Sequence, residues 1–139
     1  MSGKRATELT LATAPRSAVG RSSSLLASFR FAGEGLRWAW TTQRNLRVHG
    51  AAAVLVLAAI PLVSLTAVEI ALLLGAIVAV TAAELFNTVA EALVDLVCPQ
   101  RHPLAKVIKD VAAAEVLVTA AGAAVVGTVI LWPHLRHLF

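Results

Sequence analysis

Apolar residues in this chain fall into three long runs separated by short polar stretches. The first run follows Leu46, the second begins at Ile70 with fourteen uncharged, mostly apolar residues, and the third covers 111–132. A single helix from Val48 to Val97 would be about 75 Å long at 1.5 Å per residue, whereas the hydrocarbon layer of a membrane is about 30 Å thick. The pattern therefore predicts three separate membrane-spanning helices.

The boundary between the first two helices is marked by local signals. Pro61 and Ser64 should close the first helix. Thr66 and Glu69 have the spacing of a capping box, in which a threonine side chain and a glutamate three residues later satisfy each other's backbone N–H groups. We therefore expect the second helix to begin just after Thr66.

The ends of the later helices are marked by prolines. Cys98 precedes Pro99 and a short polar loop, so the second helix should run to about residue 97. The third should end at Pro133, with Trp132 as an anchor at the membrane interface. The predicted spans are about 46–63, 67–97 and 104–132.

A different periodicity precedes the first span. Apolar residues recur every three or four positions from Leu25 to Trp40, and most arginines lie on other sides, which indicates an amphipathic helix at about 25–43. We expect this helix to lie on the membrane surface against anionic lipids; packing against the protein's own bundle is a compatible alternative. Residues 1–24, rich in Ser, Thr, Ala and Arg, are interpreted as a disordered basic tail, with an organellar transit peptide as the alternative.

Composition and charge narrow the class of protein and its partners. Hydrophobic residues make up 58% of the chain and the mean hydropathy is +0.79, which indicates a membrane protein. With the three predicted spans and a length of 139 residues, the expected fold is all-α with one domain over 25–139. The basic residues are not interleaved with aromatic ones, which argues against a nucleic-acid partner. Eight of the twelve Lys and Arg lie before the first span or at its start, the last of them Arg47, and three follow the second. This asymmetry predicts a cytoplasmic N terminus and second loop, in the cell inner (cytoplasmic) membrane.

One polar face interrupts the second apolar run. Glu84, Asn87, Glu91 and Asp95 are spaced by three, four and four residues, so they share one side of a helix. Measured from Glu69 as the outer boundary, Glu84 lies about 22 Å and Asp95 about 39 Å along that helix, against a hydrocarbon thickness of about 30 Å. Glu84 should thus lie just inside the lipid, Glu91 at headgroup level and Asp95 in water. An ionisable residue at such a depth indicates a functional site.

This depth suits phosphoryl transfer from a charged, water-soluble donor to a lipid at the headgroup plane. Lys109 and Asp110 should reach the level of Glu91, so Glu91 would hold a metal and Lys109 would supply a cation. Glu84 would accept the proton of the lipid hydroxyl, and Asn87 would orient Glu84 or donate to a phosphate. The alternative is that the polar face only joins helices.

The stretch ELFNTVAEALVD at 84–95, followed by HPLAKVIKDVAAAEVL at 102–117, resembles the signature of the small prokaryotic membrane lipid kinases, diacylglycerol kinase and undecaprenol kinase. The similarity extends from about Phe29 to Trp132. It implies a homotrimer of three-span subunits that transfers the γ-phosphate of ATP, with Mg²⁺, to a membrane lipid alcohol. Glu84 would be the catalytic base and Glu91 a metal ligand. The nucleotide site would comprise Asn87, Glu91, Asp95, Gln100, Arg101, His102, Lys109 and Asp110.

Two positions depart from the family pattern. Gln43 stands where the family usually has a glutamate that helps hold the metal. An amide oxygen can still ligate Mg²⁺, though with less charge, so Gln43 is kept as a candidate metal ligand. Glu115 stands where the family usually has a small residue.

The acceptor lipid is interpreted from two short segments. RNLRVH at 44–49 and HPLAK at 102–106 look more like the undecaprenol kinase branch, so undecaprenol is the expected substrate and diacylglycerol the alternative. A second class of function is a small oligomeric channel or transporter. A transport path needs polar groups through the full depth of the membrane, and the outer halves of the second and third spans offer almost none.

Overall fold

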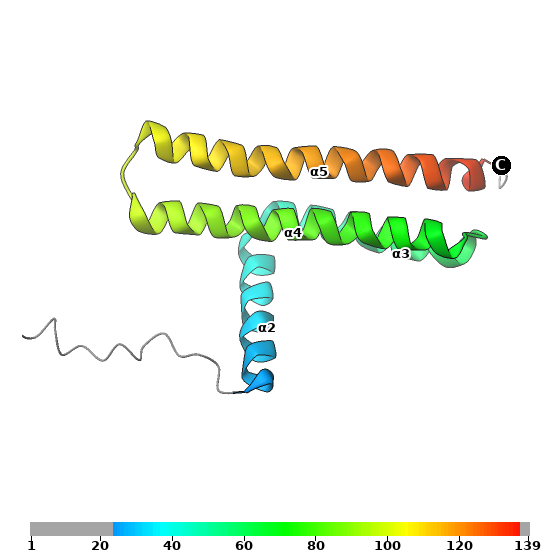
Figure 1. Ribbon diagram of the computed structural model, residues 1–139, viewed down its shortest axis with the longest axis horizontal. Helices are drawn as coiled ribbons and strands as arrows, with labels where there is room; N and C mark the ends of the chain where they lie inside the picture. Colours follow the sequence, from blue (N-terminus) through cyan, green and yellow to red (C-terminus); the bar gives the residue numbers. More distant parts are fainter. Residues whose placement is uncertain (1–23, 137–139) are drawn as a thin grey trace, which may run out of the picture. The chain divides into compact units, whose positions relative to one another are not determined.

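The computed structural model describes residues 24–136, all of whose regular structure is helical. The helices are α2 (Leu25–Thr42), α3 (Arg44–Ala59), α4 (Ala67–Val97) and α5 (Pro103–Leu135), with a short 3₁₀ helix η2 (Ile60–Leu62) after α3 (Figure 1). The tail expected over 1–24 lies, except for Ser24, outside the described residues. The all-α fold class is confirmed.

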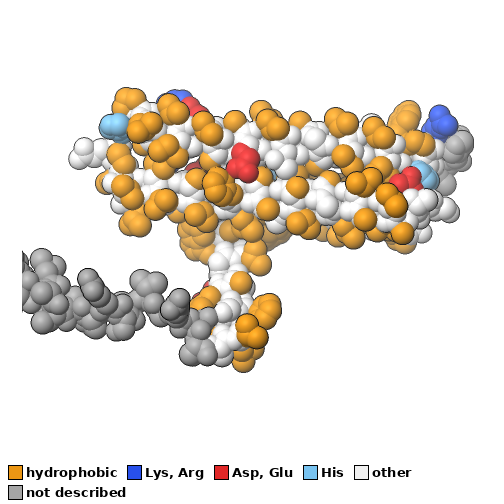
Figure 2. All heavy atoms as spheres, in the orientation of Figure 1, with side chains coloured by type: hydrophobic (Ala, Val, Ile, Leu, Met, Phe, Trp, Pro, Cys, Tyr) orange, Lys and Arg blue, Asp and Glu red, His pale blue; other side chains and the backbone are white. Residues whose placement is uncertain are grey.

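Three of these segments are long and apolar enough to cross a membrane: Arg44–Leu62, Ala67–Val97 and Pro103–Leu135. The membrane-spanning architecture predicted from the apolar runs is therefore confirmed, and the protein is a multi-pass membrane protein. Figure 2 agrees, because hydrophobic side chains are spread along the visible surface of the long helices and charged ones are few.

Helix α4 begins where its capping box predicts. The Thr66 hydroxyl accepts a hydrogen bond from the Glu69 N–H at 3.3 Å, and the Glu69 carboxylate accepts one from the Thr66 N–H at 2.7 Å. Two backbone donors at the helix start are satisfied in this way. The helix ends at Val97, and the N–H of Cys98 closes it with a bond to the Val94 carbonyl.

Helix α3 begins two residues earlier than expected. The first span was expected to start at about residue 46, but Arg44 is the first residue of α3, and Gln43 between the two helices has an extended backbone. The Arg47 guanidinium donates to the carbonyls of Trp40 and Thr41 at the end of α2. These carbonyls have no partner within α2, so the arginine satisfies groups that would otherwise be free.

Helix α5 continues past the proline that was expected to end it. Pro133 lies inside the helix, which runs to Leu135. A proline removes only its own N–H, and the N–H of Arg136 still bonds to the Trp132 carbonyl at 3.1 Å. At the other end the ring of His102 caps the helix by accepting from the Leu104 N–H, with Pro103 at the first helical position.

Helix α4 is the central element of the spanning part. It packs against both α3 and α5 and runs antiparallel to both (Figure 1). The buried residues of α4 include Leu73, Val80 and Ala83, and those of α5 include Ala112 and Val116. Small side chains at such contacts let membrane helices approach closely.

The chain divides into two compact units after Leu36, within α2. In the first, Arg30 pairs with Glu34 at 3.7 Å and its guanidinium lies over the Phe31 ring. Leu25, Leu26 and Phe29 are exposed, as the apolar face of an amphipathic helix requires. In the second, the Trp40 ring lies so close to Gly50 that an added Cβ would be 2.6 Å from it.

Candidate functional site

The polar face of α4 becomes more exposed from the middle of the helix toward its C-terminal end. Glu84 is 1% exposed and Asn87 is 6% exposed, whereas Glu91 is half-buried and Asp95 is exposed. The spacing of these residues places them on one face, and the part nearest the middle of the helix contacts His49 of α3. A carboxylate is thus held away from water at one end of a polar path that reaches water at the other.

The Glu84 carboxylate meets a side chain from α3. The Nε2 atom of His49 lies 3.3 Å from Oε1 of Glu84, at ion-pair distance. No hydrogen bond among the described residues reaches Oε1, although the atom is buried. Buried polar atoms are nearly always bonded, so this oxygen has an open acceptor position.

Asn87 and Glu91 follow Glu84 along the face and are hydrogen-bonded to each other. The Asn87 side-chain amide donates to Oε1 of Glu91 at 3.2 Å, which leaves the buried Oδ1 of Asn87 without a hydrogen-bond partner in the described chain. Mg²⁺ is commonly held by one or two carboxylates together with phosphate oxygens rather than by a full cage of protein ligands. The half-buried Glu91 carboxylate and the orphaned Asn87 oxygen fit such an ion.

A polar cavity of about 600 Å³ lies at the end of α4 where the loop leads to α5. It brings together five of the residues expected at the nucleotide site: Asp95, Gln100, Arg101, His102 and Lys109. Arg101 and Lys109 supply positive charge there. Asn87, Glu91 and Asp110 do not line this cavity.

Lys109 of α5 pairs with a residue of α4 that lies nearer the loop than expected. Lys109 was placed at the level of Glu91, but its Nζ lies 2.5 Å from Oδ1 of Asp95, one turn closer to the loop. Helix side chains point toward the N terminus of their helix, which for α5 is the loop end, so the long lysine stem extends toward Asp95. Asp110 pairs with Lys106 within α5.

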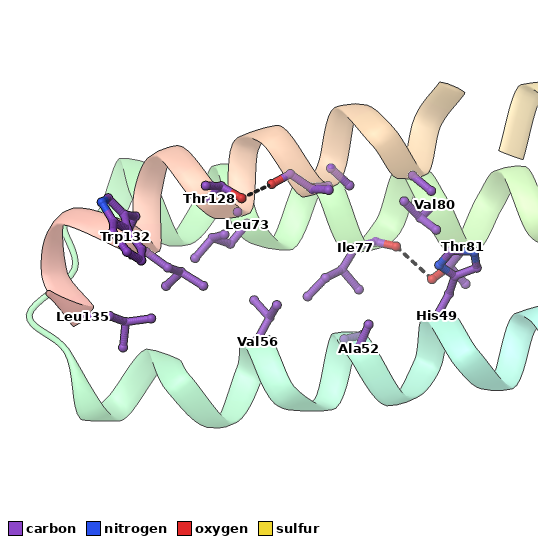
Figure 3. A pocket seen from close by; sticks show the side chains of 17 residues that line it. His49, Ala52, Val56, Leu73, Ile77, Val80, Thr81, Thr128, Trp132 and Leu135 are labelled. Atoms are coloured by element: carbon purple, nitrogen blue, oxygen red, sulfur yellow. Dashed lines mark hydrogen bonds between the residues drawn. The ribbon is translucent and has the colours of Figure 1, made fainter. Parts of the chain in front are cut away.

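An apolar groove of about 590 Å³ lies between α3, α4 and α5. Figure 3 shows His49 and Thr81 at one end and Trp132 and Leu135 at the other. Its walls are built mainly from alanines, a glycine and branched aliphatic side chains. Because His49 lines this groove and also touches Glu84, the groove opens directly beside the buried carboxylate.

Comparison with known proteins decides the family. A family model described as prokaryotic diacylglycerol kinase matches residues 30–131. The chain belongs to this family. It is 43% identical over 116 residues to a diacylglycerol kinase of Synechocystis and 40% identical over 108 residues to an undecaprenol kinase of Bacillus subtilis. It is also 30% identical over 101 residues to a diacylglycerol kinase of Escherichia coli.

The coverage of these alignments differs. The Synechocystis alignment covers 83% of this chain and 66% of the relative, so the chain spans just under two thirds of that protein. The Bacillus subtilis alignment covers 78% of this chain and 88% of the relative, and the Escherichia coli alignment covers 73% and 83%. The resemblance to the prokaryotic lipid kinase family is therefore confirmed, and the relatives are named for two different lipids.

Gln43 is the remaining predicted site residue. Gln43 lies at the start of α3, half-buried, without a side-chain capping bond. No hydrogen bond or ion pair between described residues joins it to Glu91. Within the described part of the chain no three His, Cys, Asp or Glu side chains cluster around a common metal position. The metal ligands Glu91 and Gln43 stay a prediction.

Two residues of the site were missed by the sequence analysis. His49 was quoted only as part of RNLRVH, although it is an ionisable residue at the start of an apolar run. Thr88 is buried at 3% exposure beside Glu84 and donates to the Glu84 backbone carbonyl at 2.8 Å. The position of His49 at the start of an apolar run could have identified it as a site residue. The sequence does not distinguish Thr88 from an ordinary helical threonine.

Proposed function

We propose that this member of the family is an ATP-dependent lipid kinase that phosphorylates the hydroxyl of a membrane lipid alcohol, with undecaprenol as the first candidate. The observation that carries the proposal is the buried Glu84 carboxylate. One of its oxygens has no hydrogen bond, and it lies between an apolar groove and a path of polar side chains that leads to a positively charged cavity. A lipid acceptor and a water-soluble donor can approach such a carboxylate from opposite ends.

The donor would occupy the polar cavity beside the loop. Asp95 is eleven residues from Glu84 on α4, about 16 Å at 1.5 Å per residue. That separation suits a nucleoside triphosphate whose base end lies near Gln100, Arg101 and His102 and whose γ-phosphate points toward Glu91. Lys109 and Arg101 would balance the phosphate charge. Asn87 and Asp110 complete the proposed nucleotide residues.

The chemical step follows from this placement. The lipid O–H bond breaks as its proton passes to Glu84, and the lipid oxygen forms a new bond to the γ-phosphorus. The bond from that phosphorus to the bridging oxygen of the β-phosphate breaks, and ADP leaves. Mg²⁺ held by Glu91, with Gln43 as a second ligand, would neutralise phosphate charge when bound.

The membrane setting completes the proposal. A cytoplasmic N terminus and second loop would place the nucleotide cavity in the cytoplasm, with the helices in the cell inner membrane and the basic residues near anionic lipids. Three copies would form a homotrimer.

Diacylglycerol is the second candidate substrate. The order of the two lipids rests on the segments RNLRVH and HPLAK, which resemble the undecaprenol kinase branch. Diacylglycerol is favoured by the 43% identity to the Synechocystis protein, which carries the name diacylglycerol kinase.

One assay tests both the activity and the lipid. The purified protein in one detergent would be given radiolabelled ATP, Mg²⁺ and either undecaprenol or diacylglycerol at equal mole fraction. Transfer of label to undecaprenol with a higher kcat/KM supports the first candidate, and the reverse order supports the second. Absence of transfer to both lipids, or cation flux through liposomes without ATP, would overturn the kinase proposal and favour a channel or transporter.

A further inference from the structure

His49 has no role in the reaction as proposed above. It is the sole ionisable residue between Arg47 and the end of η2 at Leu62. An ionisable side chain within a membrane span is costly and needs a partner. Its only charged contact among the described residues is Glu84, on the neighbouring helix.

The contact between His49 and Glu84 is close but is not a hydrogen bond. Nε2 lies 3.3 Å from Oε1 of Glu84, close enough for a hydrogen bond, while the alignment of donor and acceptor falls short of one. The His49 side chain is 28% exposed and lines the apolar groove, whereas the Glu84 side chain is 2% exposed. The imidazole therefore stands between the groove and the carboxylate.

The hydroxyl group of Thr81, at the same end of the groove as His49, already has a hydrogen-bond partner. Thr81 donates its hydroxyl proton to the Ile77 carbonyl of its own helix at 2.8 Å, as the dashed line in Figure 3 shows. At the far end Thr128 does the same with Ala124. Of the described groups at the inner end of the groove, His49 is thus the one whose ring nitrogen lies within ion-pair distance of Glu84.

We propose that His49 is a positioning residue for Glu84 on the lipid side of the site. With its proton on Nε2, the imidazole holds Oε1 of Glu84, so that the second carboxylate oxygen faces a hydroxyl arriving from the groove. The ring also forms the inner wall against which the first carbons of the lipid chain pack. This inference rests on the proposed function, in which Glu84 accepts the proton of the lipid hydroxyl.

Two substitutions separate the hydrogen bond from the shape of the ring. His49→Phe keeps a flat ring in the groove wall but has no N–H, and His49→Gln loses the ring but retains an N–H near the position of Nε2. Displacement of a catalytic group by about 1 Å can cost about 100-fold in rate. We expect His49→Phe to lower kcat by about 10- to 100-fold with little change in the KM for ATP, and His49→Gln to recover most of that loss.

The outer end of α4 offers a matched control. His134 on α5 faces Glu69 on α4 at 3.9 Å, and both side chains are 26% exposed, so it repeats a histidine–glutamate contact across two helices away from Glu84. His134→Phe should leave kcat near the wild-type value. Thermal unfolding and oligomer size in detergent would be measured for all three variants. An equal loss of kcat in His134→Phe, or a loss in His49→Phe matched by a loss of folded protein, would overturn the positioning role.

A double-mutant cycle tests whether His49 acts through Glu84. Glu84→Asp shortens the carboxylate and should leave a measurable residual rate. If His49 acts by holding Glu84, His49→Phe should cost much less in the Glu84→Asp background than in the wild type. Fully additive losses would overturn the proposal. The same assays keep its failure distinct from failure of the kinase: wild-type transfer that is lost in Glu84→Gln but intact in His49→Phe refutes only the role of His49.

Discussion

Glu84 is the one charged side chain that is buried among the described residues. A carboxylate removed from water costs several kcal/mol unless its oxygens are bonded, and here one oxygen is left open. Under the proposed function the chain retains this cost because the carboxylate binds the substrate hydroxyl, which is one of the explanations for an unsatisfied group in a native site.

This argument predicts the outcome of Glu84→Gln. The amide keeps the size of the side chain but cannot accept a proton, so kcat should fall by about 100-fold or more while the dissociation constant for ATP changes little. Glu69→Gln is the control, because glutamine also serves in a capping box. Turnover and ATP binding would be measured for both. Near wild-type turnover in Glu84→Gln would refute its role as the base.

Gln43 supports a second prediction at the residue scale. Its side chain is half-buried and makes no capping hydrogen bond at the start of α3, so it is free to reach an ion. Replacing the amide by a carboxylate adds a negative charge to the proposed metal site. Gln43→Glu should therefore lower the Mg²⁺ concentration for half-maximal activity. An unchanged or higher requirement would show that the metal is held without this residue.

Among the elements, α4 depends most clearly on local sequence. Its start is fixed by Thr66 and Glu69, which bond to each other's backbone and side chains. Thr66→Ala removes the acceptor for the Glu69 N–H and should lower the free energy of unfolding by about 1 kcal/mol. Activity per folded molecule should stay unchanged, since the site is at the other end of the helix.

The matched control for this element is a threonine without a capping role. Thr119 on α5 is only back-bonded to the Glu115 carbonyl, an interaction that contributes little to a helix. Thr119→Ala should shift the unfolding temperature in detergent less than Thr66→Ala does. Equal shifts would mean that the capping box does not stabilise α4 beyond any other threonine hydrogen bond.

The elements also show what a sequence can and cannot predict. Period and capping residues are local, so the start of α4 and the shared face of Glu84, Asn87 and Glu91 followed from spacing alone. Pro133 was misjudged because a proline in the last turn removes a single bond, which the helix tolerates. Contacts between helices cannot be predicted from neighbouring residues in the sequence. His49 meets Glu84, and Lys109 meets Asp95, because of how α3, α4 and α5 pack.

At the scale of the whole molecule, a single subunit has an exposed ionisable residue in the apolar part of α5. Glu115 is exposed, and no side chain in the described part of the chain pairs with it. It lies on the third span four residues beyond Val111, where the apolar run begins, or about 6 Å at 1.5 Å per residue. A carboxylate facing lipid there would be costly. A protonated acid hydrogen-bonded to another copy, as in the proposed homotrimer, avoids that cost.

The two arrangements give opposite results for Glu115→Leu. If Glu115 faces lipid, leucine removes a penalty and the protein becomes more stable. If it bonds across copies, leucine removes a hydrogen bond worth about 0.6 kcal/mol on average in membrane proteins, and three such losses in a trimer should shift dissociation to lower detergent concentration. We expect the second result, with Glu115→Gln close to wild type because an amide replaces the donor. Oligomer size across a detergent titration is the measurement. A rise in the KM for lipid in Glu115→Gln at unchanged oligomer size would instead place Glu115 beside the substrate.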